Sequence, residues 1–362
     1  MVLKKLRVML ESLKHRLALG VTRGSHFKLI ERGLYVPSRR CTERLAASPG
    51  IPAGLVGHAW VRVGPGLLFG NRQLGAIEAI LVNGFGRFGN SIIQLLNART
   101  LADRWNIPTV LFHRFDLIEN RNIDLAPAIR LERTSVAGRK ARPPRVIWAT
   151  YALRGNSLIE DGCSPGSDTV RAILSDAVAV APTVALPTQA RVLTVHIRSG
   201  DIFGPDPHRG YGQPPLSFYQ KVVLAGDWDR VDIISEDMLN PCSTHLEVWC
   251  RDRGIPVSSN CLQLSETIAR IAQAKNVVAG RGTFIPSIVF LFPRARAIYL
   301  FEPDLEPLLC DPQLKTHQVT DTQGEYLTKI LKDNWTNSHE QRHLMLNYPA
   351  KFLSPVAPWT RK

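Results

Sequence analysis

Residues 191–201 read RVLTVHIRSGD, an apolar run that ends in polar and charged side chains. The run predicts a buried strand over residues 193–197, closed by a glycine turn. Because side chains alternate along a strand, His196 and Arg198 point to the same side. An imidazole and a guanidinium at the carboxyl end of a strand suit a bound phosphate, since open α/β sheets bind ligands at that edge. Asp201 is close enough to orient either group, although a structural cluster of ion pairs is the alternative.

A glycine-rich turn follows another predicted strand, where residues 80–90 read ILVNGFGRFGN. Gly84, Gly86 and Gly89 satisfy the G-x-G-x-x-G spacing of dinucleotide-binding turns. This spacing makes an NAD(P)-dependent oxidoreductase one reading of the chain. The fingerprint also expects an acidic residue after the second strand, for the ribose hydroxyls, and Arg114 stands near that place instead. An arginine there leaves binding of a 2′-phosphate open.

A second glycine-rich turn lies between a predicted strand at residues 276–279 and an apolar helix at residues 285–291. The order of strand, turn and helix start predicts an anion site. The first N–H groups of a helix lack partners within it, and the helix dipole favours negative charge. An ordinary βαβ unit without a ligand is the alternative. The residues expected to bind substrate here are Gly280, Arg281, Gly282, Thr283 and Phe284.

Together, the three segments resemble the signatures of the fucosyltransferase superfamily, which includes the α1,2-fucosyltransferases of family 11 and the core α1,6- and protein O-fucosyltransferases. Residues 196–201 match H-x-R-x-G-D, residues 86–94 match G-R-x-G-N-x-x-x-Q, and residues 280–284 are similar to the family's S-[ST]-F segment. The resemblance implies a GT-B fold and a metal-independent, inverting transfer of fucose from GDP-fucose to a glycan or another hydroxyl acceptor, without a cofactor. The substrate-binding residues that it implies in the glycine-rich segment are Asn83, Gly84, Gly86, Arg87, Gly89 and Asn90.

The same resemblance implies roles for single residues. In related enzymes the arginine of H-x-R-x-G-D holds the phosphate, which gives that role to Arg198, with His196 beside it and Asp201 bracing the loop. Core α1,6-fucosyltransferases carry a glutamate five residues beyond the aspartate of the motif, and Asp206 occupies that position. We expect Asp206 to take the acceptor proton as general base, with His208 as the second candidate. A proline-rich turn that uses aspartate for its geometry is the structural alternative.

The chain departs from the family at two places that bear on the donor. The family's acidic residue that contacts guanine aligns with Thr267, and Glu266 stands one place before it. The hydroxyl pair that usually precedes the phenylalanine is replaced by Gly282 and Thr283. Another nucleotide sugar is therefore an alternative donor, and a carbohydrate-binding GT-B protein that has lost its activity is an alternative function.

The sequence also contains one D-x-D motif, at residues 227–229. GT-A glycosyltransferases hold a metal ion with such a motif. Here the motif falls in a loop between a predicted helix and a predicted strand at residues 231–234, which indicates a solvated turn. We therefore predict no metal site.

Strands that alternate with helices predict an α/β fold with parallel sheets. Two Rossmann-like domains with their sheets facing a cleft are the GT-B architecture that we expect. Its predicted parts are a basic N-terminal extension with an amphipathic helix (residues 1–75), an acceptor-side domain (76–188), a nucleotide-sugar domain (189–320) and a C-terminal helix and tail (321–362).

The formal net charge of +14 suits an anionic ligand, a nucleic acid or an anionic membrane surface. No nucleic-acid-binding signature occurs, so we expect a nucleotide sugar and no nucleic-acid partner. Leucines recur at helical spacing over residues 3–17 among basic residues, which predicts a helix that packs on protein or lies on a membrane surface. No signal peptide and no apolar run of about 20 residues is visible. The expected location is cytoplasmic, with peripheral membrane contact through residues 1–20 as an alternative.

Overall fold

The computed structural model divides the chain into two compact units, Met1–Ile173 and Leu174–Lys362. In unit 1 it describes the backbone of the strands. With their side chains it describes residues 88–93, 95–96, 171–172, 174–175, 178, 191–303, 309 and 311–359.

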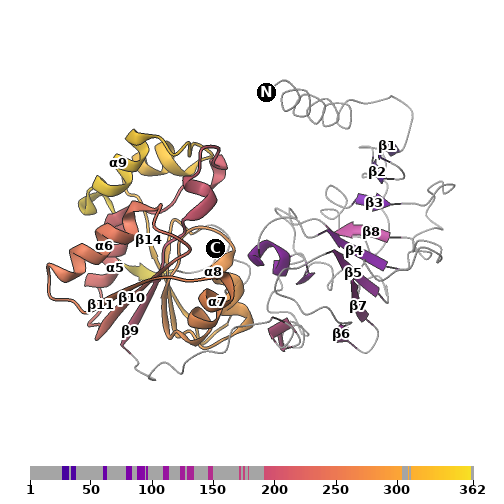
Figure 1. The fold of residues 1–362 in the computed structure, drawn as a ribbon, viewed down its shortest axis with the longest axis horizontal. Helices are drawn as coiled ribbons and strands as arrows, with labels where there is room; N and C mark the ends of the chain where they lie inside the picture. Colours follow the sequence, from indigo (N-terminus) through magenta and orange to yellow (C-terminus); the bar gives the residue numbers. More distant parts are fainter. Residues whose placement is uncertain are drawn as a thin grey trace. The chain divides into compact units, whose positions relative to one another are not determined.

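The sheet of unit 2 is formed by β9 (Val192–His196), β10 (Arg230–Ser235), β11 (Val257–Cys261), β12 (Asn276–Val278), β13 (Ala297–Phe301), β14 (Lys315–Val319) and β15 (Ala357–Pro358). The strands lie in the order β11-β10-β9-β12-β13-β14-β15, and all neighbours are parallel except β14 and β15 (Figure 1). Counted along the chain, the six parallel strands run 3-2-1-4-5-6. The order therefore reverses between β9 and β12. Open α/β sheets bind ligands at such a switch point, outside the carboxyl ends of the strands.

Helices cover both faces of this sheet (Figure 1). They are α5 (Leu216–Leu224), α6 (Pro241–Arg251), α7 (Leu264–Gln273), α8 (Phe284–Leu291) and α9 (His339–Asn347). The helices α5, α6 and α9 pack together, and α7 packs on α8. The start of α6 shows how the sequence sets these bounds, because the Asn240 side chain accepts a hydrogen bond from the backbone N–H of Cys242 and Pro241 occupies the first turn.

Unit 2 also contains short helical segments. The segments η3 (Gly200–Phe203) and η4 (Arg209–Tyr211) follow β9, and η5 (Leu327–Leu331) and η6 (Ala350–Phe352) lie in the C-terminal part of the unit. Residues 321–362, which we expected to form a C-terminal helix and tail, contain α9 and contribute to the core of unit 2. Tyr326, Trp335 and Tyr348 are buried in that core, and β15 extends the sheet.

The sheet of unit 1 contains β1 (Phe27–Glu31), β2 (Leu34–Pro37), β3 (Trp60–Arg62), β4 (Ala79–Asn83), β5 (Thr109–His113), β6 (Ile123–Ala126), β7 (Ile129–Arg133) and β8 (Val146–Ala149). Its order is β1-β2-β3-β8-β4-β5-β7-β6. The four strands β7, β5, β4 and β8 are parallel and repeat the order 3-2-1-4 of unit 2. The remaining pairs are antiparallel. Because β1 to β3 belong to this sheet, the expected N-terminal extension is part of unit 1.

The predicted α/β class is confirmed, with a mostly parallel sheet in unit 2. The sheet of unit 1 is mixed, and only its four central strands are parallel. The division between the units lies at Ile173 and Leu174, earlier in the chain than the expected boundary at residues 188 and 189. The predicted N-terminal helix, within residues 1–20, lies outside the described residues. Of the helices that the structure describes, none combines the length and the apolar character required to span a bilayer.

Candidate functional site

Two of the segments that the sequence singles out meet at the switch point of unit 2. Because β9 pairs with β12, with Val195 opposite Val278, the residues that follow both strands share one edge of the sheet. The ring of His196 lies 5.2 Å from the ring of Phe284, centroid to centroid. A Cβ atom built on Gly282 would lie 3.6 Å from Nη1 of Arg198. The loop after β9 and the glycine turn after β12 thus form a single site.

His196 is buried at the end of β9, and only 9% of its surface is exposed. Burial, and secondarily the charge of Arg198, lowers its pKa to about 3. Its Nδ1 has no hydrogen-bond partner within the described part of the chain. The imidazole is therefore neutral at physiological pH, and Arg198 alone supplies the positive charge of this pair.

Arg198 lies two residues after the end of β9 and extends into the site, with 15% of its side chain exposed. Its Nη2 lies 3.6 Å from Oδ1 of Asp201, and its Cζ lies 4.1 Å from the centroid of the Tyr211 ring. The Asp201 side chain is half exposed, and such ion pairs contribute about 0–1 kcal/mol. A guanidinium over an aromatic face contributes about 0.5–2 kcal/mol, more when water is excluded. The aromatic contact is therefore the stronger of these two restraints.

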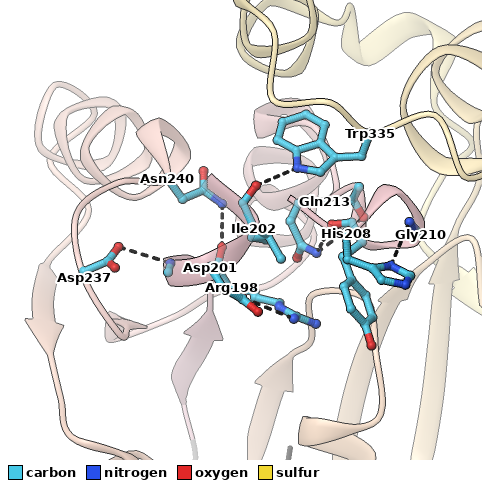
Figure 2. Close-up of polar contacts among 12 residues, drawn as sticks. Arg198, Asp201, Ile202, His208, Gly210, Gln213, Asp237, Asn240 and Trp335 are labelled. Carbon is cyan, nitrogen blue, oxygen red and sulfur yellow. Dashed lines mark hydrogen bonds and ion pairs between the residues drawn. The ribbon is translucent and has the colours of Figure 1, made fainter. Parts of the chain in front are cut away.

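The loop after β9 is fastened to the loop after β10. The Asn240 side chain donates to the backbone oxygen of Arg198 at 2.8 Å, and the Ser199 hydroxyl bonds to Asp237. Asp237 also accepts from the N–H of Gly200 at 3.4 Å (Figure 2). Gly200 has a φ of +69°, and a Cβ atom there would overlap the Glu236 carboxylate. The hydrogen bonds of Asn240 and Asp237, with the positive φ of Gly200, set the direction in which the backbone leaves β9.

The far part of the same loop is held by the C-terminal segment of unit 2. Nε1 of Trp335 donates to the backbone oxygen of Ile202 at 2.7 Å (Figure 2). Nδ2 of Asn337 donates to the backbone oxygen of Phe203 at 2.8 Å. The Tyr326 hydroxyl donates to the backbone oxygen of Gln213 at 2.7 Å. These hydrogen bonds hold residues 202–213 over the carboxyl edge of the sheet.

The glycine turn after β12 leads directly into α8. Gly282 has a φ of +113°, which side-chain-bearing residues rarely adopt, and α8 begins two residues later. Arg281 lies in the turn and donates to the backbone oxygen of Glu302 at 3.4 Å. The helix dipole of α8 and the charge of Arg198 favour an anion at the same place.

Gln213 is a component of the site that the sequence did not indicate. It is completely buried, and its Nε2 donates to the backbone oxygen of Tyr211 at 2.9 Å. Its Oε1 lies 2.9 Å from the position of a Cβ atom on Gly280, and it has no hydrogen-bond partner among the described residues. Position 280 therefore favours glycine, because any side chain there would clash with the Gln213 amide. Gln213 and Tyr211 lie in a turn without hydrophobic periodicity, so no sequence pattern marks them.

The two candidate bases lie in the loop between η3 and η4, and both are exposed. Nδ1 of His208 accepts a hydrogen bond from the N–H of Gly210 at 3.2 Å, and its ring lies 4.7 Å from the ring of Tyr211 (Figure 2). The structure thus connects His208 to Arg198 through Tyr211. Asp206 is placed in the same loop, with its side chain in solvent.

The candidate guanine contacts on α7 are both engaged in local structure. The Glu266 carboxylate accepts from the N–H of Gln263 at 3.0 Å, which caps the start of the helix. Thr267 is buried, and its hydroxyl lies 3.4 Å from the backbone oxygen of Leu262. A role for either side chain in base recognition remains a prediction.

The candidate residues in unit 1 are described only in part. Asn83 ends β4, and Gly89 and Asn90 lie in the helical residues 88–93 that follow it. Gly84, Gly86 and Arg87 lie outside the described residues. The strand order of unit 1 reverses between β4 and β8. The glycine segment follows β4, so it follows a strand beside that switch point.

The D-x-D motif lies at the opposite edge of the sheet in unit 2. It precedes β10, so it stands at the amino ends of the strands. Asp227 and Asp229 form ion pairs with Arg191, at 2.6 and 3.3 Å, and the Asp227 side chain is 90% exposed. The predicted solvated turn is confirmed.

The solved structures to which this chain is similar include two heptosyltransferases of E. coli, both at low similarity. Heptosyltransferase II of E. coli, described as an ADP-heptose lipopolysaccharide heptosyltransferase, is 12% identical with a TM-score of 0.33, and the match covers 66% of this chain and 89% of that one. The E. coli heptosyltransferase WaaC with ADP-2-deoxy-2-fluoro heptose is 10% identical with a TM-score of 0.31, covering 66% and 92%. No family model and no curated protein matches the chain. Identities this low carry no information on the substrate of this protein.

Proposed function

We propose that the protein is an inverting glycosyltransferase that uses a nucleotide sugar, and that unit 2 binds the donor diphosphate. One observation carries this proposal. The strand order brings Arg198 and the glycine turn at residues 280–284 to the same switch point, with the start of α8 beside them. Each feature alone suits a phosphate, and their convergence at the ligand edge of the sheet suits a diphosphate.

The chemistry of glycosyl transfer matches these groups. When the sugar leaves, negative charge develops on the β-phosphate and must be stabilised. The Arg198 guanidinium offers a planar pair of N–H donors to phosphate oxygens. The dipole of α8 adds a fixed positive potential, and the neutral imidazole of His196 can donate one hydrogen bond from its protonated nitrogen. Fixed positive groups of this kind favour a transfer that does not depend on a metal ion.

The resemblance of residues 196–201 to the fucosyltransferase signature makes GDP-fucose the first candidate for the donor. A different nucleotide sugar is the second candidate, because Glu266 is occupied by the helix cap and Thr267 is buried. The acceptor is expected to be a glycan or another hydroxyl compound.

The geometry favours Asp206 over His208 as the general base. A neutral imidazole has one nitrogen with a free lone pair, and in His208 that nitrogen is Nδ1, which already accepts from the N–H of Gly210. His208 would have to break this hydrogen bond to take a proton. The exposed carboxylate of Asp206 has two acceptor oxygens and can meet an acceptor hydroxyl directly.

A panel of nucleotides tests the proposed donor site. We expect GDP and GDP-fucose to raise the melting temperature in EDTA, because ligand binding stabilises the native state by an amount set by ligand concentration over Kd. The panel includes ADP, UDP, CDP, NAD and NADP, each measured with EDTA and with Mg²⁺. If UDP or ADP alone stabilises the protein, the donor carries that nucleotide and not GDP. If NAD or NADP alone stabilises it, the proposal of a glycosyltransferase is wrong. Binding of GDP-fucose without transfer to any acceptor would indicate an inactive relative.

Replacing Asp206 tests the base. We expect Asp206→Asn to lower turnover by at least about 100-fold, in line with the usual contribution of general base catalysis. The Kd for GDP should stay within a factor of two or so, because the base meets the acceptor and not the diphosphate. The acidic limb of the pH–rate profile should also disappear. His208→Ala is the matched variant in the same loop, and if it rather than Asp206→Asn abolishes turnover, the imidazole is the base.

A further inference from the structure

The side chain of Tyr211 lies against the group that the proposed function depends on most. Its ring sits under the guanidinium of Arg198, with Cζ 4.1 Å from the ring centroid. The contact joins the end of β9 to η4, across the whole loop between them. Tyr211 is half-buried, so the ring shields one face of the guanidinium from water.

Both the backbone and the ring of Tyr211 contact neighbouring residues. Its backbone N–H donates to the backbone oxygen of His208 at 3.1 Å, and its own backbone oxygen accepts from Gln213 Nε2 at 2.9 Å. The imidazole of His208 packs beside the ring at 4.7 Å. The hydrogen bonds fix the backbone of Tyr211, and the ring itself packs against His208 and against the core of unit 2.

An arginine side chain is long and loses considerable conformational entropy when a ligand fixes it. A ring that holds the guanidinium in one plane before the ligand arrives removes part of that loss, which is the general benefit of preorganisation. Asp201 restrains Arg198 less strongly, because it is half exposed and lies 3.6 Å away. A planar guanidinium also needs a defined orientation to offer two parallel N–H groups to a phosphate.

We propose that Tyr211 is a positioning residue, whose ring holds the Arg198 guanidinium in the orientation that receives the donor diphosphate. This inference rests on the proposed function, and it adds a residue that neither the motif nor its spacing indicates. The face of the ring makes the contact, so the phenolic hydroxyl is not required.

A double-mutant cycle tests this role, with GDP as the probe and its Kd measured by titration calorimetry. Tyr211→Leu is expected to raise the Kd about 10-fold, and Tyr211→Phe by no more than about 2-fold, because the aromatic face is retained. In an Arg198→Lys background, Tyr211→Leu should have an effect below about 2-fold. A merely structural residue would weaken binding equally in both backgrounds. Tyr211→Gln replaces the leucine variant if that protein does not fold.

Trp249→Leu is the matched control. Trp249 makes the same kind of contact with Arg253, at 4.3 Å, on α6. We expect this variant to leave the Kd for GDP unchanged. An equal loss in both Arg198 backgrounds, or a Tyr211→Phe variant as weak as Tyr211→Leu, overturns the positioning role.

The same proteins separate this inference from the proposed function. If the wild-type protein binds no nucleoside diphosphate, the proposed function fails. The double-mutant cycle of Tyr211 and Arg198 is then measured with the free energy of unfolding in place of the Kd. A coupling between Tyr211 and Arg198 in those values supports the contact that holds the guanidinium. Additive effects overturn it.

Discussion

Arg198→Lys is expected to lower glycosyl transfer by at least about 100-fold, on the order of 3 kcal/mol of transition-state stabilisation. Lysine keeps the charge but loses the planar fork that can hold two phosphate oxygens at once. It also loses the flat face that packs on Tyr211 at 4.1 Å. The fold should persist, because the backbone at this position is held by the Asn240 side chain and not by the guanidinium. Initial rates with GDP-fucose, together with a thermal melt, measure both effects.

The control for this variant is Arg191→Lys. Arg191 pairs with Asp227 and Asp229 at the amino ends of the strands of the same sheet. The candidate site lies at the opposite, carboxyl ends of these strands. The replacement should leave transfer unchanged. A folded Arg198→Lys protein with near wild-type rates would remove Arg198 from the site, and an equal loss in both variants would point to a general effect of replacing an arginine and not to a role at the ligand edge.

Gly212→Ala is expected to lower the free energy of unfolding by about 2–3 kcal/mol, the usual cost of forcing atoms into a packed interior. Gly212 is buried between Tyr211 and Gln213, and a Cβ atom there would lie 2.2 Å from the backbone oxygen of Ile330 in η5. A backbone oxygen cannot swing aside as the end of a side chain can. The loop or η5 must therefore shift, and GDP affinity should fall with stability. Urea denaturation and calorimetry on the same protein measure the two quantities.

Gly254→Ala is the comparison for this effect. Gly254 has a φ of +67°, but a Cβ atom there would meet nothing within 4 Å. Its cost is then the strain of the left-handed backbone alone, about 1 kcal/mol, with GDP affinity unchanged. Equal losses of stability in the two variants would contradict the close approach between Gly212 and Ile330.

The sequence predicted the strands that are buried on both faces. The expected strand at residues 193–197 is β9, and the expected strands at residues 231–234 and 276–279 are β10 and β12. The sequence did not predict β11 or β14, whose residues read VSSNC and KTHQV. Both lie toward the outside of the sheet and are mostly half-exposed, so they lack the apolar run that marks a central strand.

The sequence predicted the separate segments of the candidate site, but not that they meet at one edge of the sheet. Apolar runs and glycine turns located Arg198 and residues 280–284, but nothing in the sequence says that β9 and β12 are neighbours, because strand order depends on packing of the whole sheet. The neutral state of His196 was also beyond the sequence, since it follows from burial. Tyr211 lies in a loop, where contacts come from tertiary structure and no periodic pattern records them.

The hydrogen bonds from Tyr326, Trp335 and Asn337 to the loop after β9 have a consequence for synthesis. A ribosome releases the chain from its amino end, and these three residues follow both strands that carry the site. While they are still in the exit tunnel, the carbonyl groups of Ile202 and Phe203 lack the donors that hold the loop in its final shape. The proposed nucleotide site is thus expected to reach its final shape late, when the segment around Asn337 has emerged and docked.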